Sequence, residues 1–303
     1  MFTRLLRQIH PGKELAFTYH SSGYGPGVNG VDPKLLDGDE NAILDFRFST
    51  SPKLTWYFDH HVSAFPSPED RSTYEEKAKK REPQMFHDGT YGSCTKLIAD
   101  IGAARFGLDP APTAELVRWA DMIDSANFPS AEMAVLRTEP VLQLMAVVEQ
   151  GGDDAFLARM VPRLLAEPLL DVARSPDVTL LAAPLREGHE AFVALVKSKA
   201  VEKDGVVLVD LTDQILEVAG KFVTYALYPK SAYSVLVTRS KTKCKISIGY
   251  NPWSPKPRTH NIAAICERHG GGGHAVVGAI SLLADKADEA RRLGAEIAAE
   301  LAS

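Results

Sequence analysis

The triplet Asp59-His60-His61 is the group in this sequence best suited to metal binding or acid–base chemistry. It follows the apolar run Leu54–Phe58, which has the pattern of a buried strand. In open α/β sheets, ligands bind in the crevice at the carboxyl ends of the strands. Adjacent side chains of an extended segment point in opposite directions, so one histidine would bind a metal ion while the other faces substrate.

Two aspartates interrupt apolar segments in a similar way. Asp45 follows a short strand-like run, and Asp124 follows a predicted helix with apolar flanks. With His60 they form a set of oxygen and nitrogen donors suited to Mn²⁺, Mg²⁺ or Zn²⁺, without the thiolates of a structural zinc site. Taken singly, each residue is more simply explained as the polar end of an element in a solvated turn. Asp121, one helical turn before Asp124, is the alternative ligand.

Four consecutive glycines, residues 270–273, precede His274 and form the second informative motif. Glycine lacks a Cβ atom, so such a loop lets backbone amides approach a phosphate group. A flexible linker is the alternative. It is disfavoured here because the run lies between a predicted helix and an apolar strand with no polar spacer, where four glycines are costly in entropy.

The length and composition place these motifs in a soluble protein of two domains. The chain has 303 residues, of which 45% are hydrophobic and 24% charged. The net charge of −5 argues against a scaffold that binds long nucleic acids. The 3 cysteines are widely spaced and odd in number, which favours a reducing compartment. Neither a membrane span nor a secretory signal is recognisable, and we expect a cytoplasmic protein.

The element pattern predicts an α/β fold, with an N-terminal parallel-sheet domain over residues 1–150. A helical connector over 151–200 and a smaller C-terminal α/β domain with a mixed sheet over 201–303 follow. In the first domain the periodicity predicts a helix at 2–9, strands at 15–19, 42–44 and 54–58, a charged surface segment at 67–81 and helices at 95–106 and 112–123. The segment 25–30 resembles a dinucleotide fingerprint. Pro26 and the short polar sequence that follows, Val31-Asp32-Pro33, do not open the required helix and favour a simple glycine loop.

The second domain should begin with a strand, and a helix and a β-hairpin should follow. The predicted ranges are a strand at 206–210, a helix at 215–227, a hairpin of 234–238 with 243–249, a helix at 261–268, a strand at 275–282 and a final helix at 286–301. This arrangement places the glycine run in a loop between the last strand and the helix before it.

Taken in order, the motifs Asp45, Asp59-His60-His61, Asp124-Ser125 and Gly271-Gly272-Gly273-His274 resemble those of the DHH phosphoesterase superfamily. The chain is most similar to the two-domain type with a C-terminal DHH-associated domain. Members of that type include nanoRNases, RecJ exonucleases, phosphoadenosine phosphatases and cyclic dinucleotide phosphodiesterases. The resemblance spans most of the chain, and the triplet combined with the distant GGGH motif is its most specific feature.

The resemblance implies a hydrolase that uses two Mn²⁺ ions, with Mg²⁺ as the alternative, in a cleft between the domains. It implies that Asp45 bridges the ions and that His60 and Asp124 bind one of them. Asp59 would hold the histidine pair, and His61 would contact the scissile phosphate. The residues implied to hold the phosphate or nucleotide end of the substrate are Gly271, Gly272, Gly273 and His274.

Two departures from the family pattern bear on activity. The first family motif, a strand with a His/Asp cluster, should precede the helix at 2–9; we therefore expect the chain to lack its opening strand. In the second domain, Ser247-Ile248-Gly249-Tyr250 stands where the family often has Ser-Leu-Arg-Ser. The residues available to replace that arginine are Arg258, Arg268, Asn251 and His260.

The resulting hypothesis is a metal-dependent phosphodiesterase that hydrolyses short oligonucleotides or small nucleotides by metal-activated water. The alternative is a non-catalytic nucleotide-binding or regulatory protein that has lost one metal site. We expect a nucleotide or short oligonucleotide as partner and no membrane. The sequence leaves open whether the chain forms a homodimer.

Overall fold

The computed structural model describes residues 1–22, 30–80, 84–151, 153–216, 220 and 222–303. They form two compact units, each described by itself below. The first comprises Met1–Asn127 with Pro140–Leu180, and the second comprises Phe128–Glu139 with Leu181–Ser303. The segment predicted as a connector contains the helices α7 (Asp154–Ala166), α8 (Leu169–Ala173) and α9 (Pro176–Lys199), and α9 continues from the first unit into the second. The domain limits at residues 150 and 200 stay predictions.

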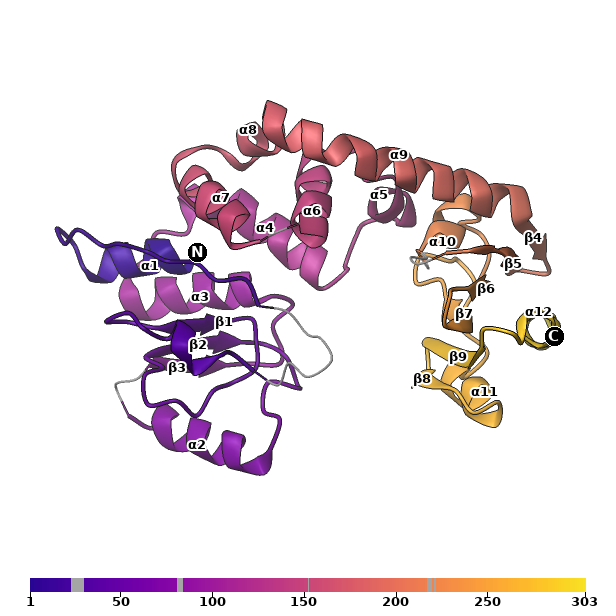
Figure 1. Cartoon of the computed structure of the whole chain (residues 1–303), viewed down its shortest axis with the longest axis horizontal. Coiled ribbons are helices and arrows are strands. Elements are labelled where there is room, and N and C mark those ends of the chain that lie inside the picture. Colours follow the sequence, from indigo (N-terminus) through magenta and orange to yellow (C-terminus); the bar gives the residue numbers. More distant parts are fainter. Residues whose placement is uncertain (23–29, 81–83, 152, 217–219, 221) are drawn as a thin grey trace. The chain divides into compact units, whose positions relative to one another are not determined.

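The first unit is built on a parallel sheet of the order β1-β2-β3 (Figure 1). The strands are β1 (Ala42–Leu44), β2 (Trp56–Asp59) and β3 (Gln84–His87). Side chains alternate between the faces of a strand. Trp56 and Phe58 therefore pack against α1 (Phe2–Ile9) and α3 (Cys94–Phe106), whereas Tyr57 packs on the opposite face, toward α2 (Pro68–Ala78).

Local signals explain where the helices of the first unit begin and end. Ser67 and Asp70 form a capping box at the start of α2. The Ser93 side chain caps α3, and Gly107 ends that helix in the left-handed conformation, with φ 67°. The helix α4 (Ala114–Asp124) follows α3 and packs against it. The first unit also contains α6 (Pro140–Gly151) and the short 3-10 turns Pro33–Leu35 and Ala111–Thr113, whereas α5 (Ala131–Leu136) belongs to the second unit.

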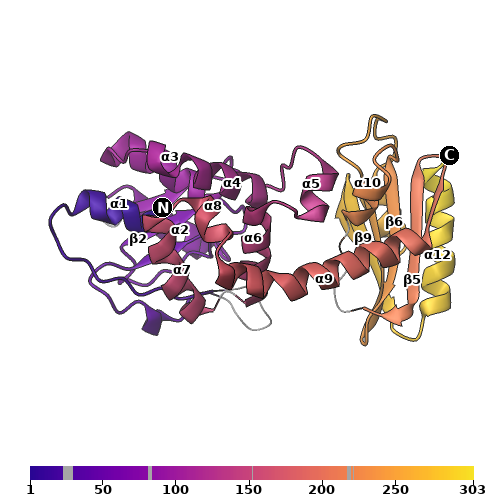
Figure 2. The ribbon, with the colours of Figure 1, turned by 90° about the horizontal axis from the view of Figure 1, so that it is seen from above.

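The second unit contains a mixed sheet of the order β4-β5-β6-β7-β9-β8. Its strands are β4 (Ala200–Lys203), β5 (Val206–Ile215), β6 (Tyr233–Arg239), β7 (Lys243–Tyr250), β8 (Gly272–His274) and β9 (Val277–Leu283). One face is apolar and packs against α11 (Ile262–Arg268) and α12 (Ala287–Leu301). On the other face, α5, α9 and α10 (Val223–Leu227) cover β5 and β6 (Figure 2).

The structure confirms the α/β class, with a parallel N-terminal sheet and a mixed C-terminal sheet. The predicted helices at 2–9, 95–106, 261–268 and 286–301 and the hairpin of β6 with β7 are present, with ends that differ by a few residues at most. The charged segment forms the exposed helix α2. None of the helices in the described part of the chain combines the length and apolar character that crossing a membrane requires.

Three predicted elements were wrong. Residues 15–19 form no strand; Leu15 and Phe17 instead pack against the core below α1, and the Tyr19 hydroxyl lies 3.1 Å from that of Thr3. The predicted helix at 215–227 is helical only over α10, because β5 continues to Ile215 by pairing with β6; residues 217–219 and 221 lie outside the described part. The glycine run is not wholly a loop, since its last two glycines pair with β9. Residues 25–29 of the glycine-rich N-terminal segment also lie outside the described part.

Candidate functional site

Asp59, the last residue of β2, has a fully buried carboxylate. Its Oδ1 accepts hydrogen bonds from the backbone amides of His60 (2.8 Å) and His61 (3.1 Å) and lies 2.7 Å from Nδ1 of His61. Its Oδ2 accepts a hydrogen bond from the Tyr57 hydroxyl at 2.9 Å. The buried charge is thus well satisfied, as buried polar groups require, and it fixes the backbone and one ring of the histidine pair.

His60 presents a buried nitrogen to two carboxylates. Its Nδ1 lies 3.0 Å from the backbone oxygen of Tyr91, and because a carbonyl only accepts, Nδ1 carries a proton. Its Nε2 lies 3.3 Å from Oδ1 of Asp45 and 3.2 Å from Oδ2 of Asp124. This nitrogen makes no well-formed hydrogen bond within the described residues. A lone pair facing two carboxylates is repulsive, so the arrangement requires a cation: a proton on Nε2 or a bound metal ion.

Asp45 lies directly after β1 in a left-handed backbone conformation, with φ 59°. This conformation is uncommon for residues other than glycine, although aspartate tolerates it better than most. Its amide donates to the backbone oxygen of Phe58 at 2.9 Å, which ties the turn to the neighbouring strand. Residues in such conformations cost about 1–3 kcal/mol and cluster at functional sites. The turn brings the Asp45 carboxylate to the histidine pair.

The electrostatics of this cluster also favour a bound cation. Burial raises the pKa of Asp45 against the opposing charges of His61 and His60. Burial and then the charge of Asp45 raise the pKa of Asp124. Burial disfavours protonation of His61, but its hydrogen bond to Asp59 and the nearby carboxylate charges outweigh it and raise its pKa. The carboxylates are held close together at a cost that a cation would remove.

The donor set fits a divalent metal ion. Asp45, His60 and His61 each offer a ligand atom, and these atoms lie within 4.8 Å of one another. In this group Nδ1 of His61 is already 2.7 Å from Asp59, which leaves Nε2 as its available nitrogen. Asp124 faces Nε2 of His60 as well. Carboxylate and imidazole ligands suit Mn²⁺, Mg²⁺ and Zn²⁺, so the donors by themselves do not select the metal.

Asp121 occupies a different environment from Asp124. Its Oδ1 accepts a hydrogen bond from the hydroxyl of Ser93 at 3.0 Å, at the start of α3. A side chain on the neighbouring Gly92 would press against the same carboxylate. Of the two aspartates considered from the sequence, Asp124 is therefore the one that lies beside His60.

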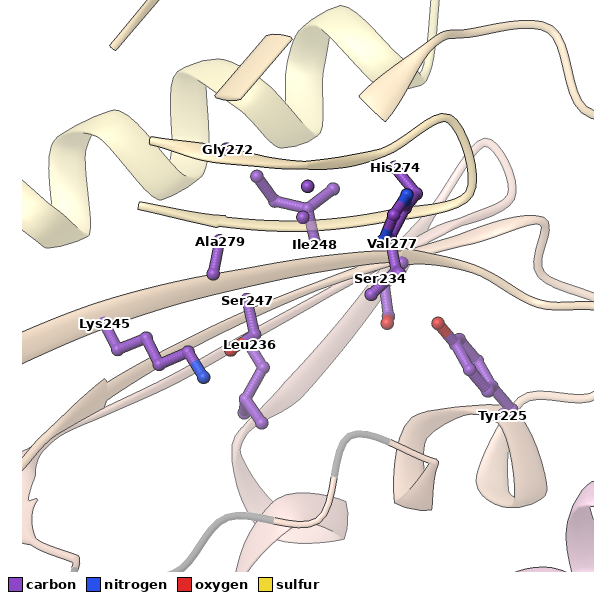
Figure 3. A pocket seen from close by; sticks show the side chains of 13 residues that line it. Tyr225, Ser234, Leu236, Lys245, Ser247, Ile248, Gly272, His274, Val277 and Ala279 are labelled. Carbon is purple, nitrogen blue, oxygen red and sulfur yellow. The ribbon is translucent and has the colours of Figure 1, made fainter. Parts of the chain in front are cut away.

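The second unit contains a pocket of about 260 Å³ on the face of its sheet (Figure 3). Gly272, Gly273 and His274 of the glycine motif line it. Gly271 is not among its lining residues; a side chain there would collide with the backbone of Ala279. The remaining lining residues come from β6, β7, β9 and α10: Tyr225, Ser234, Leu236, Lys245, Ser247, Ile248, Gly249, Val277, Gly278 and Ala279.

The two arginines expected to assist in substrate binding lie outside this pocket. Arg258 donates to the backbone oxygens of His260 at 3.0 Å and Ala275 at 3.3 Å. Arg268, at the end of α11, forms an ion pair with Glu300 of α12. Their role in binding substrate stays a prediction. In the structure both side chains contact other residues of the second unit.

Two other residues considered for that role also have structural contacts. The buried Asn251 side chain donates to the backbone oxygens of Pro229 and Ser231. His260 lies 2.8 Å from the Thr259 hydroxyl through Nδ1.

Tyr225 and Lys245 line the pocket but were not among the site residues predicted from the sequence. Lys245 and Ser247 alternate along β7 with the buried residues Cys244, Ile246 and Ile248. This alternation with period two identifies the open face of the strand and was available from the sequence. No comparable signal points to Tyr225, which reaches the pocket from α10.

Comparisons with known proteins give a fold match and no family. No protein-family model and no curated protein matches the sequence. Among solved structures, the chain is similar to a pGpG-specific phosphodiesterase, PggH from Vibrio cholerae, with 21% sequence identity and a TM-score of 0.65 over 98% of this chain and 94% of that chain. An uncharacterized protein from Helicobacter pylori G27 aligns over 88% of this chain and 86% of that one at 12% identity, but its TM-score of 0.25 is too low to support an argument. The likeness to the Vibrio enzyme establishes a shared fold.

Proposed function

We propose that this chain is a metal-dependent phosphodiesterase of the DHH phosphoesterase superfamily that hydrolyses short oligonucleotides or small nucleotides such as pGpG. The observation that carries the proposal is the buried Nε2 of His60, which lies within 3.3 Å of carboxylate oxygens of both Asp45 and Asp124 without a hydrogen bond among the described residues. The fold likeness to a pGpG-specific phosphodiesterase over nearly the whole chain supports it.

In this proposal Asp45, His60 and Asp124 would hold a divalent ion, Mn²⁺ or Mg²⁺, and Asp45 would also serve as a ligand of a second ion. Bound ions of this kind lower the pKa of water and stabilise charge on the phosphoryl group during in-line displacement. Tyr91 keeps the proton of His60 on Nδ1, which leaves Nε2 as the ligand atom. The hydrogen bond from Nδ1 to the Tyr91 oxygen also fixes the orientation of the His60 ring, as is usual for histidines that bind metal ions.

Asp59 and His61 act on the substrate side of the cluster. Asp59 binds Nδ1 of His61 and keeps that nitrogen protonated. Burial opposes protonation of His61, but its hydrogen bond to Asp59 and the nearby carboxylate charges raise its pKa and so favour the imidazolium form. Its Nε2–H then donates a hydrogen bond to a phosphate oxygen, or a proton to the leaving oxygen of the nucleotide. Hydrolysis of pGpG in this way consumes one water and releases GMP from each half.

In this proposal one domain binds the metal ions and the other binds the substrate. Residues 1–150 form the metal-binding DHH domain, residues 151–200 form the connector, and residues 201–303 form the domain that holds the substrate. Gly272, Gly273 and His274, which line the pocket of the second unit, contact the phosphate or nucleotide end. Gly271 lets the chain just before β8 lie close to β9, since its position has no room for a side chain.

The proposal is tested by hydrolysis rates on bis-p-nitrophenyl phosphate and pGpG with Mn²⁺, with Mg²⁺ and with EDTA. We expect turnover only with metal, and a loss of about 100-fold or more in His60→Ala, since a ligand is removed. His269→Ala is the matched control, because His269 is an exposed residue at the end of α11. No metal-dependent turnover on either substrate would refute the proposal, and saturable nucleotide binding in EDTA would then favour the non-catalytic alternative.

A further inference from the structure

The floor of the pocket in the second unit is made of small residues in cross-strand register. Ser247 of β7 pairs with Ala279 of β9, which pairs with Gly272 of β8. Two residues along, Gly249 pairs with Val277, which pairs with His274. Cross-strand partners share a face of the sheet. The larger apolar residues Cys244, Ile246 and Ile280 of the same strands belong to the core on the opposite face. The hollow therefore lies where Ser247, Gly249, Gly272 and Ala279 leave little side-chain volume.

The positions of the glycine motif differ in whether the fold leaves room for a side chain. Side chains at Gly271 and Gly273 would collide with the backbone of β9, so packing alone requires glycine at these positions. A Cβ atom at Gly272 would have no atom within 4 Å, and the backbone there is not left-handed. The fold therefore does not require glycine at 272. Because this residue lines the pocket, its missing side chain leaves space that a ligand can use.

Lys245 supplies the positive charge of this pocket. Among the described residues that line it, Lys245 is the sole lysine or arginine, and neither aspartate nor glutamate is present. Its ammonium group forms no ion pair with the residues that the structure describes, whereas Lys199, Arg268 and Arg291 of the same unit each do. An anion at this end of the pocket would meet a positive charge and no carboxylate.

The Tyr225 hydroxyl defines the other end of the pocket. It lies over Gly249, in the space that a side chain at 249 would take, with the Ser234 hydroxyl nearby (Figure 3). Burial raises the pKa of Tyr225 to about 12, against a smaller opposing effect of its hydrogen bond with Ser234, so the hydroxyl stays protonated. The side chain is held by ring contacts with Phe222 and Trp253, with centroids 6.1 and 6.3 Å away.

We infer that Lys245 and Tyr225 are the residues by which this pocket selects its ligand, a single nucleotide unit with its phosphate at Lys245 and its nucleoside toward Tyr225 and Ser234. The five residues from Lys245 to Gly249 span about 14 Å of strand, which suits a mononucleotide laid along β7. The volume of about 260 Å³ lies below the range of roughly 300–1,000 Å³ for drug-sized ligands, and it favours one nucleotide over two. The choice of a nucleotide rests on the proposed function; the residue assignment rests on the pocket.

Binding of GMP to the full chain in EDTA tests this inference separately from catalysis. Isothermal titration calorimetry with GMP and with guanosine should show that wild-type protein prefers GMP. Lys245→Gln should weaken GMP binding about 10-fold or more and leave guanosine unchanged, because only the charged contact is removed. Tyr225→Phe should weaken both ligands several-fold. Lys203→Gln, at an exposed lysine on the opposite edge strand β4, is the matched control.

The outcomes separate the two proposals. If Lys245→Gln and Tyr225→Phe bind GMP as wild type does, with unchanged thermal unfolding, the residue assignment is wrong. Absence of saturable GMP binding by the wild-type chain at millimolar concentrations overturns it as well. Metal-dependent hydrolysis of bis-p-nitrophenyl phosphate by the wild-type chain, which needs no nucleoside contact, reports on the proposed function in either case.

Discussion

The carboxylate of Asp59 is fully buried and lies 2.7 Å from Nδ1 of His61. Because the same oxygen also accepts the amides of His60 and His61, one side chain determines the position of the histidine pair. The ligand and acid–base residues of the proposed site therefore depend on a residue that contacts neither solvent nor, in our account, substrate.

Replacing Asp59 by asparagine should preserve the fold and impair catalysis. The amide oxygen can still accept from the backbone, and the Tyr57 hydroxyl retains the Phe46 oxygen, 3.1 Å away, as an acceptor. Loss of the charge lowers the pKa of His61, since Asp59 is a principal cause of its being raised. We expect kcat to fall about 10–100-fold and the alkaline limb of the pH–rate profile to move to lower pH. Unchanged kcat and profile would show that Asp59 is only structural.

Asp124 and Asp121 should separate metal binding from stability. Asp124→Asn should weaken Mn²⁺ binding about 10-fold or more, because its oxygen faces Nε2 of His60. Asp121→Asn should leave Mn²⁺ affinity within about 3-fold, but cost about 1 kcal/mol of stability through its hydrogen bond with Ser93. Calorimetric titration with Mn²⁺ and thermal unfolding measure the two effects. The reverse pattern would make Asp121 the ligand.

Asp45 and His61 should each contribute less to the stability of the metal-free protein as pH rises. The pKa of Asp45 is raised in the folded state by burial, so the folded chain loses stability as pH rises above about 4 through that raised value. The pKa of His61 is raised too, by Asp59 against burial, so its stabilising contribution is lost as pH rises through a value above 6.5. Both groups act in the same direction.

Asp45→Asn should therefore stabilise the metal-free protein, by about 1 kcal/mol or less because the side chain is partly exposed. Asparagine tolerates the left-handed backbone that Asp45 adopts. The gain should grow as pH rises through the raised pKa of Asp45 and should disappear as pH falls below about 4. Thermal unfolding with Mn²⁺ should reverse the order, because only the wild type gains stability from the ion. A variant that Mn²⁺ stabilises as strongly as the wild type would contradict the site.

Two adjacent glycines should respond oppositely to alanine. Gly271→Ala must displace the backbone of Ala279 and should cost about 1–3 kcal/mol. Gly272→Ala meets no neighbouring atom and should be neutral or stabilising by up to about 1 kcal/mol. Urea denaturation measures both. Gly188→Ala, at an open position in α9, gives a reference for the effect of the methyl group alone.

Gly249 and Tyr225 should show strong coupling in a double-mutant cycle. Gly249→Ala alone should be destabilising, since the added methyl group collides with the Tyr225 hydroxyl. In the Tyr225→Phe background the hydroxyl is gone and the nearest ring carbon lies 3.3 Å from the methyl position, so much of the cost should be recovered. We expect a coupling energy of about 1–2 kcal/mol from urea denaturation. Additive effects would show that the two residues do not share this space.

The sequence predicted those parts of the fold and site that local patterns encode. Asp45 and Asp59 end apolar strands, and the structure has both at strand ends. The serine caps and the final glycine of α3 act within a few residues of the chain, so the helix boundaries were nearly correct. Such features depend on local hydrogen bonds and on periodicity.

Other features depend on contacts between distant segments. β3 was not predicted, because only Met85 and Phe86 are apolar and the preceding segment is charged; it forms by pairing with β2. Residues 15–19 have the alternating pattern of a strand but pair with no other strand; the side chains of Leu15 and Phe17 pack against the core instead. The place of Tyr225 over Gly249 joins residues 24 positions apart, and no local pattern encodes it.

The most direct test of the central claim is the initial rate of pGpG conversion to GMP with Mn²⁺, measured for the wild-type chain and for His60→Ala. We expect metal-dependent turnover by the wild type, loss of turnover in EDTA, and a decrease of about 100-fold or more in the variant, with unchanged thermal unfolding in EDTA. Equal rates for the two proteins, or turnover that persists in EDTA, would contradict it.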